Sequence, residues 1–462
     1  MSAAWRLSAL GQPVVVLEAD TAVGGMAKTI NVGPYAVDYG PHTFHIRETE
    51  ESRTIHEAIR PFFGPDPLIL TRGTRVLLRG KQYVYPLEML QVLIGVSPFL
   101  SARIIIDYVV ATIRSTLAPP KHEDSFEDWG VRNLGRTLYD LAFGIYSARV
   151  WGLPTSQISS KQAQRVAKLN LKNVILRTLG IRADPSTYFT KYMYPRDGIS
   201  VLFENMASAV RTAGNVVRLE SRAVRLERDG DRIARVVYTS GGREESIACR
   251  GVLSTLPLPA LVNMMSPALP APVAQHAGAL RYRSLKLIYI ALKRSQLTDY
   301  HWVYLLDPQY RVNRMSEQKN VSSSMVPADR TILCIELSCW RDEPVWSASD
   351  EEVYRIALAD LMKMGYGVTE AEVDHYHVTD IATAYPVYEL NFEDHLIPVL
   401  EGVHAVTNVM TLGRHGLFLN NSMDDNVLLG MKVADQIADR GFDSASWLSQ
   451  MLAFMNLRFD GK

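Results

Sequence analysis

The sequence has few cysteines, only three among 462 residues. Cys249, Cys334 and Cys339 lack the paired spacing of a zinc site, and three scattered thiols do not make a disulfide framework. This usage is typical of a reducing compartment. Residues 1–20 also lack the basic segment, apolar core and cleavage pattern of a secretory signal, so we expect a cytoplasmic location.

There is no excess charge of either sign, because 49 Lys and Arg balance 49 Asp and Glu. Proteins that bind nucleic acid or an anionic membrane carry an excess of basic residues. Composition therefore predicts no nucleic-acid partner and favours a neutral, soluble enzyme. The length allows two to four domains with a large core, and it leaves the oligomeric state open.

The sequence has no uninterrupted hydrophobic run long enough to span a bilayer. The longest candidate is Met89–Ile113, and Pro98, Arg103 and Asp107 interrupt it. A spanning helix would place two ionisable groups in hydrocarbon at a cost of several kcal/mol. We expect two buried or amphipathic helices that are split near Pro98. A peripheral membrane contact through this segment is the less favoured alternative.

The sequence also lacks the first part of a βαβ nucleotide-binding unit. Residues 2–10 predict a helix, and Pro13–Leu17 is a short apolar, β-branched strand that ends at Glu18. In a dinucleotide-binding unit, a strand and a G-x-G-x-x-G turn precede such a helix, and an acidic residue after the second strand accepts ribose hydroxyls. Two explanations stay open. The start codon is placed too far downstream, which we favour, or the chain has lost this phosphate-binding turn.

What is present is a mixed α/β pattern. A mostly helical block covers Glu88–Arg182, and strand patterns dominate from Val216 to Val378, with turns at Asp229-Gly230 and Gly241-Gly242. A short strand at His404–Val409, a glycine-bearing loop and a helix over Asn426–Arg440 close the chain. We interpret this order as a discontinuous nucleotide-binding domain, into which other domains are inserted.

Two loops carry candidate functional residues. Gly24-Gly25 follows the first strand and allows close backbone approach, although the dipeptide alone favours an ordinary loop. His42 and His45 flank an aromatic residue beside Gly40 in the loop GPHTFH. Two histidines in a Gly-Pro loop favour a functional site. We expect no metal site, because no carboxylate or cysteine stands nearby.

These segments together resemble the flavin-dependent UDP-galactopyranose mutases, within the wider family of amine oxidases and protoporphyrinogen oxidases. The resemblance covers most of the chain. It rests on Glu18, Gly24-Gly25 and GPHTFH, on KQYVYPL, on SARVWGLPTSQISSKQAQRVAKLNL, on WVYLLDPQYRVNR, on TAYPVYEL and on LGRHGLFLNNSMDDNVLLGMKVADQI. It implies an α/β Rossmann-like FAD-binding domain without its first strand, an inserted helical domain and an antiparallel sheet. The expected boundaries are 1–80, 191–262 and 393–462 for the FAD-binding domain, 81–190 for the helical domain and 263–392 for the substrate sheet.

The resemblance also implies roles for individual residues. Arg165 and Arg311 would bind the substrate diphosphate, and His42 would lie beside the flavin, so these three are the expected catalytic residues. The expected substrate-binding residues are Trp302, Tyr304, Tyr385 and Asn420. The expected cofactor-binding residues are Glu18, Gly24, Gly25, Met26, Gly40, Gly413, Arg414, Gly416 and Asp425, the last as a helix cap. Where the mutases place a tyrosine after the closing Gly-Arg-x-Gly, this chain has Leu419, Asn420 and Asn421, so the Asn420 amide would have to donate in its place.

The function implied is the interconversion of pyranose and furanose forms of a nucleotide sugar through an adduct at N5 of reduced FAD, with NAD(P)H as the reductant. Two alternatives remain open: a redox enzyme of the same fold, and a truncated, non-catalytic homologue. An arginine pair favours the mutase, because a hydrophobic redox substrate offers nothing for two guanidinium groups to bind.

Overall fold

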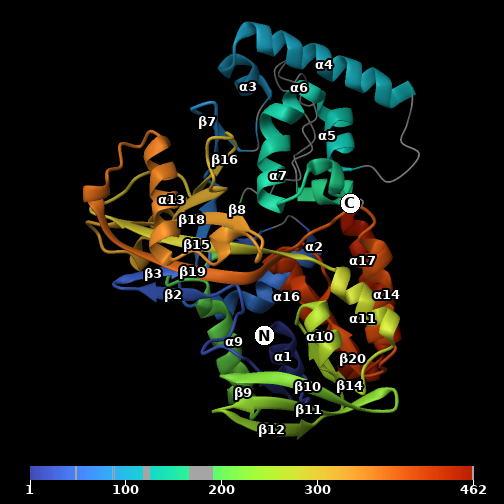
Figure 1. The fold of residues 1–462 in the computed structure, drawn as a ribbon. Coiled ribbons are helices and arrows are strands. Elements are labelled where there is room, and N and C mark those ends of the chain that lie inside the picture. Colours follow the sequence, from blue (N-terminus) through green and yellow to red (C-terminus); the bar gives the residue numbers. More distant parts are fainter. Residues whose placement is uncertain (47–48, 86, 88, 118–124, 166–190, 460–462) are drawn as a thin grey trace.

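The computed structural model describes residues 1–46, 49–85, 87, 89–117, 125–165 and 191–459, and its helices and strands confirm the mixed α/β fold (Figure 1). Segments from both ends and the middle of the chain build a parallel α/β unit. Strand β1 (Val15–Leu17) pairs in parallel with β9 (Val216–Arg218), and β13 (Val252–Ser254) pairs in parallel with β20 (Val409–Thr411). The helices α9 (Ser200–Thr212) and α16 (Met423–Arg440) pack against α1 (Ser2–Ala9).

Close packing fixes α1 against α16. Ala3, Ala4 and Leu7 form the buried face of α1. On α16, a Cβ atom added at Gly430 would lie 2.1 Å from Ser2 Oγ and 2.9 Å from the Ala3 amide nitrogen. Only glycine therefore allows the two helices to approach this closely. This contact holds the first turn of α1 against α16.

A four-stranded sheet lies at the lower end of the molecule in Figure 1, in the strand order β12-β11-β10-β14, with the first three strands antiparallel and β14 parallel to β10. The predicted turns are confirmed, since Gly230 joins the first two long strands and Gly241-Gly242 the next two, all with positive φ. Its strands are β10 (Ser221–Asp229), β11 (Arg232–Ser240), β12 (Arg243–Ala248) and β14 (Met265–Ser266).

A seven-stranded sheet with the order β19-β15-β18-β17-β16-β6-β7 forms the second large unit. Its central strands β15 (Tyr282–Leu292) and β18 (Thr331–Cys339) are almost entirely buried, and α13 (Asp350–Lys363) covers one face. The other strands are β19 (Val373–Pro386), β17 (Arg314–Glu317), β16 (Trp302–Leu305), β6 (Thr74–Leu78) and β7 (Lys81–Val84). The expected boundary at residue 80 falls inside the β6–β7 hairpin, which belongs to this sheet.

The helical insert forms the upper part of Figure 1. Its helices are α3 (Met89–Gly95), α4 (Pro98–Leu117), α5 (Phe126–Leu134), α6 (Arg136–Tyr139) and α7 (Ile145–Trp151). The predicted break near Pro98 is confirmed, but α4 buries only Ile104 and Ala111. Its apolar face is exposed instead, with Phe99 at 80% and Leu117 at 79%. In the described part of the chain, no helix is both long and apolar enough to cross a membrane.

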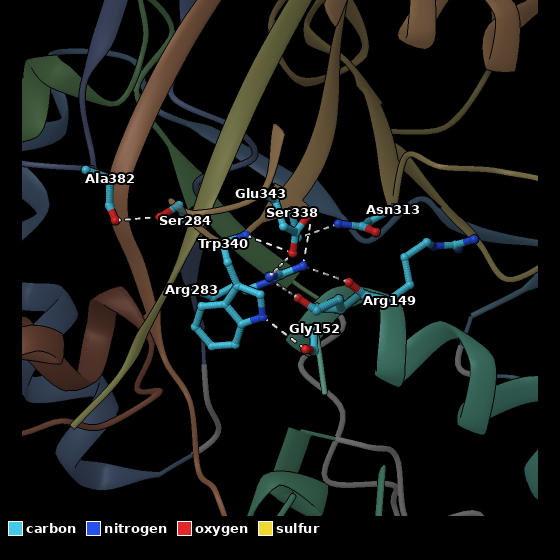
Figure 2. Close-up of polar contacts among 10 residues, drawn as sticks. Arg149, Gly152, Arg283, Ser284, Asn313, Ser338, Trp340, Glu343 and Ala382 are labelled. Atoms are coloured by element: carbon cyan, nitrogen blue, oxygen red, sulfur yellow. Dashed lines mark hydrogen bonds and ion pairs between the residues drawn. The ribbon is translucent and has the colours of Figure 1, made fainter. Parts of the chain in front are cut away.

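Arg283 joins the helical insert to the sheet (Figure 2). This β15 side chain is only 3% exposed, and its Nε donates to the Val150 carbonyl at the end of α7, 3.1 Å away. Its Nη1 also donates to Glu343 Oε1 at 3.0 Å, and the Trp340 indole donates to the Gly152 carbonyl at 2.9 Å. A cation at the C-terminal carbonyls of a helix is favourable. These bonds fix the insert above the sheet.

Shorter elements complete the fold. Two small sheets contain β2 (Thr29–Val32) with β3 (Tyr35–Asp38), and β4 (Phe44–His45) with β8 (Lys191–Tyr194) and β5 (Leu68–Thr71). The further helices are α2 (Glu50–Ile59), α10 (Leu258–Met264), α11 (Ala271–Ala279), α12 (Gln318–Val321), α14 (Glu393–His404), α15 (Gly413–Gly416) and α17 (Ser444–Phe459).

Candidate active site

A cavity of about 2800 Å³ lies between the parallel α/β unit and the seven-stranded sheet. Residues of β1, β13 and the first turn of α1 line it on one side, and residues of β16, β17 and β18 line it on another. Single-ligand pockets have roughly 300–1,000 Å³. The cavity is therefore large enough for an extended cofactor together with a substrate.

The side formed by the α/β unit consists largely of backbone and small residues. Gly24 has φ +111°, and a Cβ atom added there would lie 2.6 Å from the Ala27 carbonyl oxygen. Gly416 does not line the cavity, but an added Cβ would lie 2.8 Å from the Ser254 carbonyl oxygen. The expected cofactor residues that do line the cavity are Glu18, Gly24, Gly25, Met26, Gly40, Gly413, Arg414 and Asp425.

The helix α16 begins at the cavity, but its cap differs from the expected one. Ser422 is the N-cap, and Asp425 is the third residue of the helix. The Asp425 carboxylate accepts hydrogen bonds from the Ser422 backbone at 3.2 Å and from its hydroxyl at 2.7 Å. This reciprocal capping box explains why the helix begins at Met423, three residues before the predicted start.

His42 is a neutral side chain at the cavity wall. Its Nδ1 lies 3.0 Å from the Gly40 carbonyl oxygen, so Nδ1 carries the proton and Nε2 is an acceptor. Burial, together with the positive charges of Arg414 and Arg314, lowers its pKa to about 4. Around neutral pH the group can therefore accept a hydrogen bond or a proton, and it adds no positive charge to the cavity.

The structure does not place the expected Arg311 at the cavity, whereas Arg314, three residues further on, lines it. Arg311 is exposed and does not line the cavity, and its backbone amide donates to Asp360 of α13 at 2.6 Å. Arg314 begins β17 and lines the cavity, with Nε 2.8 Å and Nη2 2.6 Å from Glu336 Oε1. Arg314 lines the cavity because it is part of strand β17, whereas Arg311 precedes the strand in a loop. The alternation of Arg314 and Ser316 with Met315 was the signal that could have found it.

Arg165 ends a short helical segment, Ser160–Arg165, and its side chain lies outside the described residues. The neighbouring Ser160, Lys161 and Ala163 line the cavity. This segment therefore borders the site, and the diphosphate role of Arg165 stays a prediction.

The expected aromatic residues Trp302, Tyr304 and Tyr385 all line the cavity. The Arg414 guanidinium lies over the ring of Tyr385, 5.1 Å from its centre, and the centre of the Trp151 ring is 6.1 Å from that of Tyr385. The Tyr304 ring lies 5.8 Å from the Arg314 guanidinium. Each of these two phenol groups thus lies near a guanidinium group that lines the cavity.

Asn420 also lines the cavity, but its amide already has a protein partner. Nδ2 donates to the Pro386 carbonyl at 3.0 Å, and its backbone amide donates to the Tyr388 hydroxyl at 2.7 Å. Asn420 therefore holds the end of β19 beside the loop that precedes α16. The cavity residues that sequence reasoning did not single out include Arg72, Tyr85, Arg314 and Glu336.

The parallel α/β unit, the glycine-lined cavity and the covering sheet together define a flavin-dependent enzyme class. The chain belongs to the family of flavin-containing amine oxidoreductases, whose family model matches residues 1–437. Phytoene dehydrogenase from Streptomyces griseus is 36% identical over 89 residues, which is 19% of this chain and 17% of that protein.

Three solved structures share the fold over nearly the whole chain. A reduced UDP-galactopyranose mutase is similar with a TM-score of 0.81 and 17% identity, covering 97% of this chain and 96% of that one. A putative protoporphyrinogen oxidase from Exiguobacterium sp. 255-15 has a TM-score of 0.69 and 16% identity, covering 95% and 96%. Cyclohexylamine oxidase from Brevibacterium oxydans IH-35A has a TM-score of 0.64 and 17% identity, covering 95% and 96%. At these identities the likeness shows the fold alone.

Proposed function

We propose that this protein uses FAD to interconvert the pyranose and furanose forms of a nucleotide sugar. The observation that carries the proposal is that two guanidinium groups line the same cavity, Arg314 beside Tyr304 and Arg414 beside Tyr385. Planar guanidinium groups bind phosphate oxygens in two-pronged geometry, and phenol hydroxyls can add single hydrogen bonds. This combination suits the diphosphate of a nucleotide sugar.

The cavity also fits FAD. Glu18 follows β1, where a carboxylate can accept ribose hydroxyls, and the backbone at Gly24 and Gly413 is free of side chains that would block a flat ring. The first turn of α16 directs backbone amides toward the cavity. Reduced FAD would supply a nucleophilic centre for the reaction, and NAD(P)H is the proposed reductant.

The residues of the chain hold and orient the substrate. Arg314 keeps its guanidinium in place through Glu336, and Arg414 donates from Nη2 to the Asn421 carbonyl at 3.1 Å. Both are therefore preorganised for a diphosphate. His42 Nε2 offers a neutral acceptor in the same cavity, which can bind a sugar hydroxyl or the edge of the cofactor.

The alternative is an oxidoreductase of the same family. The aromatic wall of Tyr85, Trp302, Tyr304 and Tyr385 favours it, because aromatic rings bind the cationic or hydrophobic part of an amine substrate. Steady oxygen consumption with an amine would support this alternative. A folded but colourless preparation would support the non-catalytic reading.

The decisive experiment incubates dithionite-reduced, FAD-loaded protein with UDP-galactofuranose and measures the pyranose product by chromatography. We expect product with the natural chain. No product with flavin bound would overturn the mutase proposal.

UDP binding by the oxidised protein provides the matched test of the arginines. Arg314→Gln combined with Glu336→Gln removes both charges of the buried pair, so that no carboxylate is left unpaired. We expect UDP affinity to fall about tenfold or more, since a hydrogen bond to a charged group contributes about 1.5–3 kcal/mol. Arg311→Ala, which changes an exposed arginine outside the cavity, should bind UDP like the natural chain. Equal affinity in all three proteins would remove Arg314 from the site.

A further inference from the structure

A second polar feature of the cavity lies next to the Arg314 wall and is not used by the proposed function. Trp302 and Tyr304 are alternate residues of β16, so they face the same side of the sheet about 7 Å apart. Tyr304 is in register with Arg314, whereas Trp302 is in register with Ser316 and with Thr74 of β6. Trp302 therefore belongs to a different cross-strand row of the sheet from Tyr304 and Arg314, and we call the row around Trp302 the second row.

Arg72 provides an unpaired cation in this second row. Its guanidinium lies 4.7 Å from the centre of the Tyr85 ring and 5.8 Å from the Trp302 ring, and its Nε donates to Thr74 Oγ1 at 3.2 Å. It lines the cavity and forms no ion pair with any residue that the structure describes. The Arg314 charge, by contrast, is already balanced by Glu336.

Trp302 adds a donor without an acceptor. The side chain is 6% exposed, and its buried Nε1 has no hydrogen-bond partner among the described residues. Leaving a buried donor unpaired costs about 1–3 kcal/mol, so such a group indicates an acceptor that completes the site. The Tyr192 ring stacks on Trp302 at 6.2 Å and holds the indole in place.

His301 positions this row. Its Nδ1 accepts from the Gly73 amide at 3.1 Å, and its own amide donates to the Gly73 carbonyl at 2.7 Å. Both backbone groups of Gly73, next to Arg72, are therefore hydrogen-bonded to His301. The Arg72 guanidinium itself lies over the rings of Tyr85 and Trp302. The Arg72 guanidinium lies 5.8 Å from the centre of the Trp302 ring, and neither its Nη atoms nor the indole N–H has a hydrogen-bond partner among the described residues. Such a pair of donor groups matches the two oxygens of a carboxylate.

We propose that Arg72 and Trp302 form a subsite for a carboxylate of the substrate, distinct from the diphosphate wall at Arg314. Assigning that carboxylate to the sugar rests on the proposed function, and it makes the substrate class a nucleotide-linked sugar acid. The diphosphate itself is the other possible source of an oxyanion here, and the experiment below separates the two.

The first measurement needs no nucleotide. The protein is labelled with ¹⁵N-tryptophan, and the indole signal of Trp302 is assigned by its absence in Trp302→Phe. Titration with D-glucuronate should shift this signal in the natural chain and leave it unmoved in Arg72→Gln. Galactose, which is uncharged, should not shift it. An indole signal that ignores glucuronate, or that moves equally in Arg72→Gln, would overturn the subsite.

The second measurement compares UDP-glucuronate with UDP-glucose. The two differ only at C6, which is a carboxylate in the first and a hydroxymethyl group in the second. We expect the natural chain to bind UDP-glucuronate about tenfold more tightly, and Arg72→Gln to lose this preference while keeping its affinity for UDP. If Arg72→Gln weakens UDP as strongly as UDP-glucuronate, the row binds the diphosphate and the carboxylate proposal fails.

The two measurements also separate this subsite from the proposed function. If UDP does not bind but glucuronate still shifts Trp302 in an Arg72-dependent way, the nucleotide-sugar proposal fails and the subsite stands. If UDP binds through Arg314 and the indole signal does not respond to glucuronate, the carboxylate subsite fails and the nucleotide-sugar proposal stands. Thermal melting of Arg72→Gln and its flavin absorbance provide the folding control.

Discussion

The two sides of the cavity are built from different materials. The α/β side presents glycines, backbone amides and the start of a helix, as at Gly24, Gly413 and Ser422. The sheet side presents long side chains in rows, as at Arg314 and Trp302. The first side depends on backbone conformation, and the second depends on which residues of a strand point inward. Substitutions should therefore damage the two sides in different ways.

The α/β side should tolerate the least change where backbone atoms crowd a glycine. Gly24→Ala places a Cβ atom 2.6 Å from the Ala27 carbonyl at a φ of +111°, so the loop must move. We expect most of the flavin to be lost, measured as absorbance near 450 nm per mole of protein after desalting.

The adjacent Gly25 gives a matched control. An added Cβ there meets nothing within 4 Å, and its φ of +62° is one that other residues adopt at a cost of about 1–2 kcal/mol. Gly25→Ala should therefore keep most of its flavin. Equal retention by both variants would show that this loop does not contact the cofactor.

The sequence predicted the α/β side better than the sheet side for a physical reason. Gly24, Gly40 and Gly413 are recognisable because their roles are local, and all three line the cavity. To predict which residues of the sheet side point into the cavity, the residue at which each strand starts must be known. An error of three residues there replaced the inward Arg314 with the exposed Arg311. Arg72 carried no local signal, because its neighbour Trp302 is 230 residues away in the chain and meets it only through strand pairing.

The helical insert shows the same limit. The break before α4 could be predicted from Pro98, since proline ends or starts a helix by a local effect. Burial could not be predicted, because it depends on which helices lie alongside. The sequence predicted two buried or amphipathic helices, and the apolar side chains of Ile106 and Ile113 on α4 are exposed.

Acid should destabilise the fold through histidines on both sides of the cavity and outside it. Burial lowers the pKa of His42, His301, His404 and His415 to about 4 from 6.5. Below pH 6.5 the unfolded chain binds protons that the folded chain does not, so stability falls as the pH falls toward 4. Each histidine contributes up to about 1.4 kcal/mol per pH unit in this window. Asp38 opposes them, because burial raises its pKa to about 6 and it gains a proton in the folded state.

Single substitutions can show which histidines cause the loss of stability as the pH falls. We expect melting temperatures to fall between pH 7 and pH 5, and His404→Gln to fall less steeply, since Gln can keep the contacts to Ser444 and Thr411 without titrating. His42→Gln should flatten the slope similarly and also shift the flavin spectrum, because His42 lines the cavity and His404 does not. An unchanged slope in both variants would place the acid sensitivity elsewhere.

The smallest effect tests whether the α16 terminus serves the cofactor as well as the fold. Ser422 caps α16 at the cavity and Ser349 caps α13 behind the sheet, each with an acidic residue three positions later in a capping box. Replacing either serine with alanine removes the same hydrogen bond, worth about 1 kcal/mol, and should lower the melting temperature by about 2 °C. Only Ser422→Ala should weaken flavin retention, because only that cap orients amides toward the cavity. If Ser349→Ala loses as much flavin, the loss reflects general stability, and the α16 terminus has no separate part in binding.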